Sequence, residues 1–260
     1  PVLKDEYIVV GAHFDHLGLG GSRSGSLDPD TIIIHNGADD NASGTAGILE
    51  LSYKLMSNRH LLKRSVLFVC FDAEEKGLLG SKYYVENPVR NISNAAMMVN
   101  MDMIGRLNDN PVILEGVGSS GNFENIIADA RNNHTLDVET NMGGMDFGRS
   151  DHASFYRENI PVLFFFTGAH EDYHKPTDDW DKIDYQGEKE ILDFIYDLII
   201  DISQLQEKPA FAEIETNTTN NQNPVFKVTF GVIPAYGSQK VGLEIDGVSK
   251  KDGPAAKAGM

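Results

Sequence analysis

The segment VLFVCFDAEEKGLLGS, residues 66–81, places two adjacent carboxylates, Glu74 and Glu75, directly after an apolar run of strand length. A glycine-bearing turn and a helical pattern follow at once. In α/β proteins, ligands bind outside the carboxyl ends of the strands. Two neighbouring glutamates repel each other unless positive charge lies beside them, and a divalent metal site supplies that charge. The segment therefore predicts an α/β fold with a metal site at the end of this strand.

Apolar runs of strand length alternate with helical patterns over residues 1–207. The strand-like runs are residues 7–12, 31–34, 66–71, 95–103, 112–115 and 160–167. Apolar residues recur at helical spacing in residues 44–56, 123–133 and 188–205. This alternation predicts a three-layer α/β/α sandwich around a mostly parallel central sheet. We expect residues 160–167, which are apolar almost throughout, to form a central strand, and residues 112–115 an edge strand.

Composition and charge exclude several classes of protein. The net charge of −17 argues against nucleic-acid binding, because little basic surface remains to neutralise phosphates. No apolar run is long enough to span a bilayer, and the single cysteine, Cys70, can form no intrachain disulfide. The chain starts at Pro1 and stops at Met260 within a recognisable pattern. We therefore expect part of a longer protein, with any export signal lying upstream.

Polar loops that carry acidic or histidine side chains follow several of the expected strands. The candidates are His13 with Asp15, Asp39 with Asp40, Glu74 with Glu75, Asp102, and His174. Parallel strands deliver their carboxyl ends to one edge of a sheet, so these side chains are expected to meet there. Carboxylate oxygens and imidazole nitrogens are ligands that suit zinc. The remaining histidines near these loops are expected to form hydrogen bonds or line a pocket: His16, His35, His152 and His170.

Six segments share their residues and their order with a known family: GAHFDH, NGADDNASG, FDAEEKGLLGS, NMDMIG, GRSDHASF and DYHKPTD. They resemble the signature segments of the bacterial di-zinc aminopeptidases, whose wider family contains glutamate carboxypeptidase II and the zinc glutaminyl cyclases. The resemblance runs from residue 9 to residue 184. It implies a metal-dependent exopeptidase that binds two Zn²⁺ ions and removes N-terminal residues from peptides through a di-zinc-bound hydroxide.

The resemblance also implies a role for each matching residue. Five residues are implied as metal ligands: His13, Asp40, Glu75, Asp102 and His174. His13 and His174 would each bind a different zinc ion. Asp40 would bridge the two ions, because the family places the bridging aspartate immediately before an asparagine, here Asn41. The Asp40–Asn41 peptide bond is expected to be cis, as in relatives.

Glu74 resembles the general base of the family. A water shared by two zinc ions loses its proton near neutral pH, and a carboxylate that is not a ligand can pass this proton to the leaving amine. Asp15 is expected to accept the far N–H of His13 and so fix its tautomer. Arg149 and Tyr173 resemble residues that stabilise the oxyanion in relatives. The alternatives are a surface salt bridge for Arg149 and core packing for Tyr173.

The C-terminal part of the chain changes character. Residues 208–224 are polar and rich in Asn and Thr, which predicts a linker. Residues 225–260 form a short β-rich segment with the runs VTFGVIPAY, GLEIDGVSK and GPAAKAGM. This segment resembles the first half of a PDZ module, found appended to some bacterial members of the family; an unrelated β-rich extension is the alternative. We expect an exported bacterial protein, periplasmic or on the cell surface.

Two other kinds of function remain open beside the aminopeptidase. The same scaffold can carry carboxypeptidase or glutaminyl-cyclase chemistry, or it can bind peptides without catalysis. Recognition of a C-terminal carboxylate calls for arginines, and Arg149 is the only one within the six segments. Cyclases usually work with a single zinc, and non-catalytic relatives lose ligands, whereas every ligand position is filled here. Peptide substrates are the expected partners, and the sequence does not indicate an oligomeric state.

Overall fold

The computed structural model describes residues 2–22, 24–108, 111–141, 150–214, 232–234, 245–248 and 253–259. The strands are β1 (Leu3–His13), β2 (Arg64–Phe71), β3 (Ala95–Met101), β4 (Val112–Glu115), β5 (Val138–Asn141), β6 (Val162–Phe166), β7 (Val232–Pro234) and β8 (Ile245–Val248). The helices are α1 (Gly44–Ser57), α2 (Leu79–Glu86), α3 (Phe123–Asn133), α4 (His152–Arg157), α5 (Tyr185–Gln204) and α6 (Pro254–Lys257). Shorter helical turns are η1 (Ala38–Ser43), η2 (Arg59–Leu61), η3 (Ile92–Asn94), η4 (Val117–Ser119) and η5 (Trp180–Lys182).

Six strands form one mixed sheet in the order β2-β1-β3-β6-β4-β5. Strand β1 pairs in parallel with β2 and β3, and β3 pairs in parallel with β6. Strand β4 is parallel to β5 but antiparallel to β6. The four strands β2, β1, β3 and β6 therefore end at the same edge of the sheet. The expected mostly parallel sheet is confirmed, as is the central position of β6.

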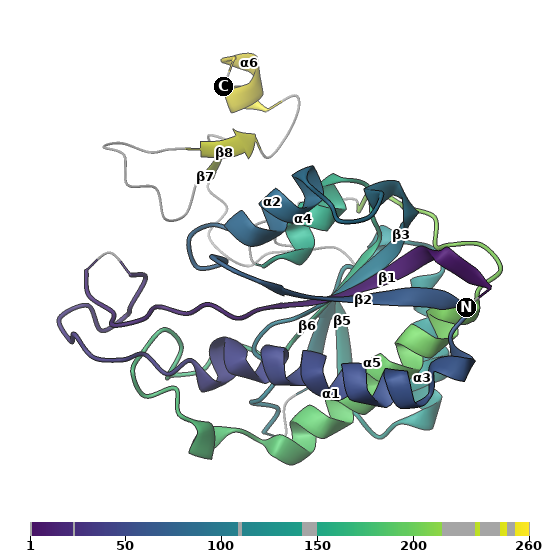
Figure 1. Cartoon of the computed structure of the whole chain (residues 1–260). Coiled ribbons are helices and arrows are strands. Elements are labelled where there is room, and N and C mark those ends of the chain that lie inside the picture. The colour runs from purple at the N-terminus through teal and green to yellow at the C-terminus, as the bar shows by residue number, and fades with distance from the viewer. Residues whose placement is uncertain are drawn as a thin grey trace.

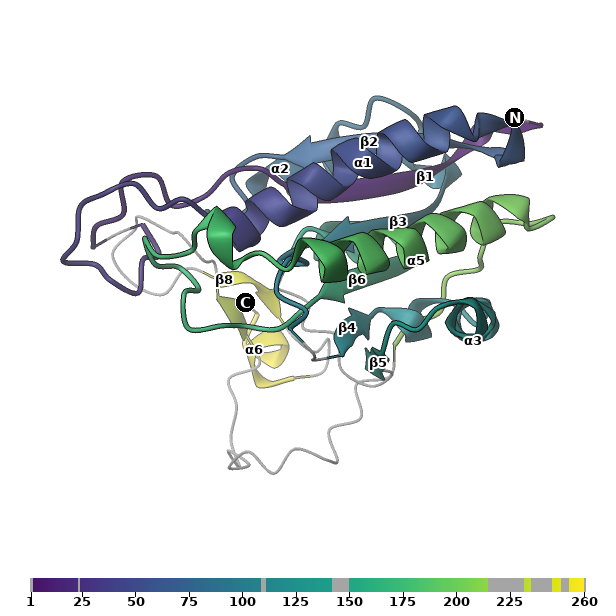
Figure 2. The ribbon, with the colours of Figure 1, turned by 90° about the horizontal axis from the view of Figure 1, so that it is seen from below.

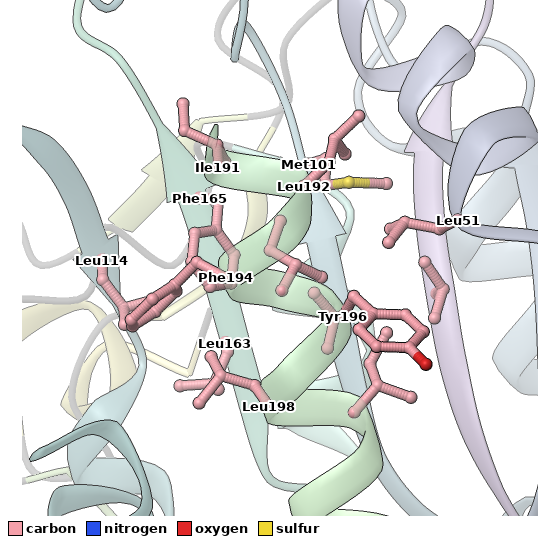
Figure 3. Packing of buried hydrophobic residues seen from close by; sticks show 14 of the residues in the cluster. Leu51, Met101, Leu114, Leu163, Phe165, Ile191, Leu192, Phe194, Tyr196 and Leu198 are labelled. Atoms are coloured by element: carbon pink, nitrogen blue, oxygen red, sulfur yellow. The ribbon is translucent and has the colours of Figure 1, made fainter. Parts of the chain in front are cut away.

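Helices cover both faces of the sheet, which confirms the three-layer arrangement (Figure 1). Helices α1, α3 and α5 lie on one face, and α2 and α4 lie on the other. Figure 2 shows α1 and α5 side by side across the first face. Figure 3 shows Phe165 and Leu163 of β6 packed against Phe194 and Leu198 of α5. The apolar stripe of α5 recurs every three or four residues, which turns one helical face toward the strands.

Two expectations about strands are wrong. Residues 31–34 form no regular strand; Ile32 makes one isolated bridge to Gly20, and the side chains of Ile32, Ile33 and Ile34 are 72%, 50% and 66% exposed. β-branched residues favour strands only where a neighbouring strand and a buried face are available, and this loop runs beyond the end of the sheet (Figure 1). Strand β4 is not an edge strand, because the short β5 pairs with its outer side.

The C-terminal segment contributes a two-stranded antiparallel pair, β7 with β8, and the short helix α6. Residues 215–231, which include most of the expected linker, lie outside the described residues, as do most of residues 235–252. The division at residues 207 and 224 and the PDZ resemblance therefore stay predictions. None of the helices in the described ranges combines the length and the apolar character needed to cross a membrane.

Candidate metal centre

The five predicted metal ligands are brought together at the carboxyl edge of the parallel strands. His13 is the last residue of β1, Asp102 directly follows β3, and Glu75 lies in the loop after β2. His174 lies in the loop between β6 and α5, and Asp40 lies in η1, just before α1. Since β2, β1, β3 and β6 are neighbours with a common direction, their loops converge on one point.

The five side chains form two groups that share Asp40. In the first group, His13 Nε2 lies 3.4 Å from Asp40 Oδ1 and 3.4 Å from Asp102 Oδ1. In the second group, His174 Nε2 lies 3.3 Å from Asp40 Oδ2 and 3.2 Å from Glu75 Oε2. The two oxygens of Asp40 therefore face different histidines, which is the arrangement of a bridging carboxylate.

The spacing of these atoms fits zinc. Two ligand atoms that each lie 2.0–2.1 Å from a tetrahedral zinc ion are about 3.3 Å apart. The four separations in the two groups, 3.4, 3.4, 3.3 and 3.2 Å, agree with this value. The donor set of imidazole nitrogens and carboxylate oxygens is also one that zinc accepts. The residues present therefore fit two zinc ions that share one carboxylate.

A second histidine reaches the Glu75 side of the centre. His16 Nδ1 lies 3.0 Å from Glu75 Oε1 but 3.8 Å from Asp40 Oδ2. A grouping by distance alone joins His16, Asp40 and Glu75 as a possible cation site. His174 Nε2 is nearly equidistant from the two carboxylate oxygens that face it, as the predicted ligand role requires, and that role stays a prediction. His16 instead contacts the other oxygen of Glu75.

The carboxylates make the centre strongly favourable to positive charge. Burial opposes a charge on His13, but Asp102, Asp15 and Asp40 outweigh burial and raise the pKa of His13 well above its ordinary value. Burial likewise opposes a charge on His174, whereas the hydrogen bonds that its ring donates to Asp40 and Glu75 raise its pKa to about 10. Burial would raise the pKa of Asp40, yet contacts with His13 and His174 lower it. Cations are the natural occupants of such a pocket.

Glu74 lies beside the two groups and belongs to neither. Burial raises the pKa of its carboxyl well above the ordinary value; His13 opposes this, and the like charges of Asp102, Asp151 and Glu75 add to it. A raised pKa of this kind is typical of a carboxyl group that takes up and releases a proton during catalysis. The geometry is compatible with the predicted general base, whose role stays a prediction.

Asp15 supports the centre through two different groups, its backbone carbonyl and its carboxylate. His13 Nδ1 lies 3.0 Å from the backbone carbonyl oxygen of Asp15 and 3.6 Å from its Oδ1, so the carbonyl is the nearer acceptor. The Asp15 carboxylate instead accepts the backbone N–H groups of Glu74, at 2.9 Å, and of Glu75, at 3.3 Å. Asp15 therefore orients His13 and also ties the loop after β1 to the loop after β2, which the sequence did not suggest.

Of the two residues expected to stabilise an oxyanion, one lies at the centre. The ring of Tyr173 stacks on that of His174 with 3.9 Å between centroids and 20° between planes. Burial raises the pKa of Tyr173 above its ordinary value, and the charges of Asp40 and Glu75 raise it further. The hydroxyl thus remains a protonated donor near the carboxylates. Arg149 lies outside the described residues, and its role stays a prediction.

Three residues around the ligands have left-handed backbone although they are not glycine. Ala73, just before Glu74, has φ 55°; Met103, just after Asp102, has φ 55°; and His174 itself has φ 55°. Such conformations are unfavourable by about 1–3 kcal/mol each and persist where the surroundings impose them, often at functional sites. No sequence pattern marks these positions, because alanine, methionine and histidine are ordinary residue types in loops.

A buried network holds the backbone of the bridging residue. Asp178 Oδ2 accepts the N–H groups of Asp39, at 2.9 Å, and of Asp40, at 3.0 Å. Asp178 Oδ1 pairs with Arg106 at 2.9 Å, and the same guanidinium nitrogen lies 3.3 Å from Asp172. Asp178 closes the segment DYHKPTD, so the motif pointed to this position, but sequence reasoning assigned it no role.

The other aspartate of the tandem pair serves the loop rather than the centre. Asp39 Oδ1 accepts the N–H of Gly105 at 2.7 Å, and its Oδ2 lies 3.1 Å from His170 Nε2. The Asp40–Asn41 peptide bond is cis, as the resemblance implies. The side-chain amide of Asn41 donates to the carbonyl oxygen of Met101 at 3.0 Å, which joins this loop to β3.

The chain is similar to known zinc peptidases. The sequence model described as Peptidase family M28 matches residues 2–199. Leucine aminopeptidase 2 of Trichophyton equinum is 31% identical over 169 residues, which cover 62% of this chain and 31% of that protein. The chain thus spans about a third of the length of the curated relatives it matches.

Solved structures share the fold. The Legionella pneumophila LapA aminopeptidase superposes with a TM-score of 0.61 and 25% identity, over 79% of this chain and 53% of that chain. A Bacteroides thetaiotaomicron glutaminyl cyclase gives a TM-score of 0.61 at 20% identity, over 76% and 73%. The fold is therefore common to enzymes with different reactions. By its sequence match over residues 2–199 and its fold, the chain belongs to peptidase family M28.

Proposed function

We propose that this chain carries the catalytic site of a di-zinc aminopeptidase, which removes N-terminal residues from peptides. The observation that carries the proposal is the position of Asp40, whose two oxygens each lie at zinc-ligand spacing from a different histidine. Membership of peptidase family M28 and similarity to leucine aminopeptidases support the same conclusion.

Each of these residues has a separate role in the proposed hydrolysis of a peptide bond. Two zinc ions held by the two groups would lower the pKa of a water and polarise the scissile carbonyl. Glu74 takes a proton from the attacking water as its oxygen bonds to the carbonyl carbon. When the C–N bond breaks, Glu74 returns this proton to the leaving amine. Tyr173 donates a hydrogen bond to the carbonyl oxygen as negative charge develops there.

Recognition of a substrate C-terminus calls for an arginine that is free to bind its carboxylate. Arg106, four residues after Asp102, is instead paired with the buried carboxylates of Asp172 and Asp178. This favours amine recognition over carboxylate recognition.

Hydrolysis of aminoacyl-nitroanilides by the Glu74→Gln variant tests the proposal, with zinc measured by elemental analysis. The amide keeps the size of the side chain but cannot carry the proton, so we expect activity to fall by about 10²–10⁴-fold. Zinc should remain at two ions per chain. Glu86→Gln, on the exposed surface of α2, is the matched control and should keep full activity.

Two results would overturn the proposal. Full activity in Glu74→Gln would show that Glu74 is not the general base. A wild-type chain that holds one zinc ion and cyclises N-terminal glutamine, but releases no nitroaniline, would assign the site to the cyclase reaction.

A further inference from the structure

His16 makes a contact at the centre that the proposed mechanism does not use. Its Nδ1 lies 3.0 Å from Glu75 Oε1. A carboxylate can only accept, so the imidazole Nδ1–H is the donor. The other oxygen of Glu75, Oε2, lies 3.2 Å from His174 Nε2, on the side of the second zinc group. The two oxygens of Glu75 therefore face different histidines.

The ring of His16 is held in one place. Gly37 has φ 60°, and a Cβ atom there would lie 2.7 Å from both Cγ and Cδ2 of His16. The rings of His16 and His174 meet edge to face with 6.0 Å between centroids. Within the described residues, the buried Nε2 of His16 has no hydrogen-bond partner. The packing therefore holds the ring in the orientation in which Nδ1 can donate to Glu75.

We propose that His16 is a positioning residue for the second zinc ion. It donates to Oε1 of Glu75 and leaves Oε2 as the single ligand atom on the side of His174. A glutamate has three side-chain torsions, and without this donor its carboxylate can rotate away from the ligand position. Outer partners of metal ligands typically change metal affinity by about 10–100-fold. The inference rests on the proposed function, because it presumes two zinc ions.

The segment GAHFDH would then support both metal positions. His13 is a ligand of the first group, and the Asp15 carboxylate holds the backbone of Glu74 and Glu75. His16, at the end of the same segment, holds the side chain of Glu75. One short loop therefore supports both zinc positions. Replacing His16 removes a hydrogen bond only from Glu75, which belongs to the second position.

Zinc affinities of the full chain, measured by competition with a chromogenic chelator, test the proposal. In His16→Ala we expect one of the two zinc ions to bind about 10–100-fold more weakly and the other to bind as in the wild type. In His16→Asn the amide N–H lies close to the position of Nδ1, so we expect the affinity to return to within a few-fold. His35→Asn is the control: His35 is buried in the same loop, but its nitrogens contact Ser26 and the carbonyl of Ile33. Its zinc affinities should match the wild type.

Several results would overturn the inference. Wild-type zinc affinities in His16→Ala would show that His16 does not position Glu75 for zinc binding. Equal weakening of both ions in His16→Ala, or a matching loss in His35→Asn, would indicate a general effect on the loop. If His16→Asn is as weak as His16→Ala and the absorption spectrum of the cobalt-substituted protein changes, His16 is itself a ligand. A wild type that holds two zinc ions without hydrolysing nitroanilides would refute only the proposed function, whereas a wild type holding fewer than two refutes both.

Discussion

Replacing Asp178 by asparagine tests whether the buried network sets the position of the bridging carboxylate. Asp178 is fully buried; one oxygen accepts the N–H groups of Asp39 and Asp40, and the other pairs with Arg106. Asparagine keeps the shape but turns one acceptor into a donor. Whichever way the amide is rotated, its NH₂ group faces either two backbone N–H groups or the guanidinium group.

The magnitude follows from the loss of one partner in a buried ion pair, which typically destabilises by about 3–5 kcal/mol. A chain of this size loses about 2–4 °C of Tm per kcal/mol, so we expect the melting temperature of Asp178→Asn to fall by roughly 6–20 °C. Because the backbone N–H of Asp40 loses a charged acceptor, we also expect zinc to bind about 10–100-fold more weakly.

Circular dichroism melting, with and without zinc, measures the first effect, and chelator competition measures the second. Asp179→Asn is the matched control: Asp179 is half-buried and accepts from the Asn36 amide at 2.6 Å. We expect its stability to change by no more than about 0.5 kcal/mol. If Asp178→Asn melted within 2 °C of the wild type, which is at most about one kcal/mol by the scale used above, and kept its zinc affinity, the network would have no positioning role.

Three further predictions follow from other contacts. Arg64 is fully buried and donates to three carbonyl oxygens at the end of α5. Arg64→Met removes these charged donors, so we expect the free energy of unfolding in urea titrations to fall by about 1.5–3 kcal/mol, and an unchanged midpoint would contradict this. At Gly37, a Cβ would lie 2.4 Å from the Asp40 carbonyl oxygen, so Gly37→Ala should weaken zinc binding by chelator competition, and wild-type affinity would refute the clash. Burial opposes the charge on His174, but its carboxylate partners raise its pKa to about 10, above the value in the unfolded chain. The protonated ring therefore stabilises the folded state fully below about pH 6.5, and this stabilisation is lost as the pH rises toward 10. The Tm of zinc-free protein should therefore fall from pH 7 to 10, and fall less in His174→Gln; equal slopes would contradict the assignment.

Local sequence patterns determined the layers of the fold and the residue types at the centre. The apolar stripe of α5 indicates which face of the helix is buried, and the uniformly apolar β6 indicates a strand buried on both faces. The two patterns can be told apart because side chains repeat differently along a helix and a strand. Carboxylates and histidines directly after apolar runs indicated the edge where ligands would gather. Both kinds of signal lie within about ten residues of sequence, which is why they could be recognised without a structure.

Pairings across long stretches of chain were decided only by the tertiary structure. The β-branched run at residues 31–34 has strong strand propensity, yet within the described part of the chain no strand edge lies beside it, and its isoleucines remain exposed. The hydrogen bond from the N–H of Asp40 to Asp178 joins residues 138 positions apart, and that from His16 to Glu75 joins residues 59 apart. Side chains at such separations meet only after the sheet has ordered its strands. The sequence therefore determined which groups reach the centre, and the packing of the loops decided which atom of each group faces which partner.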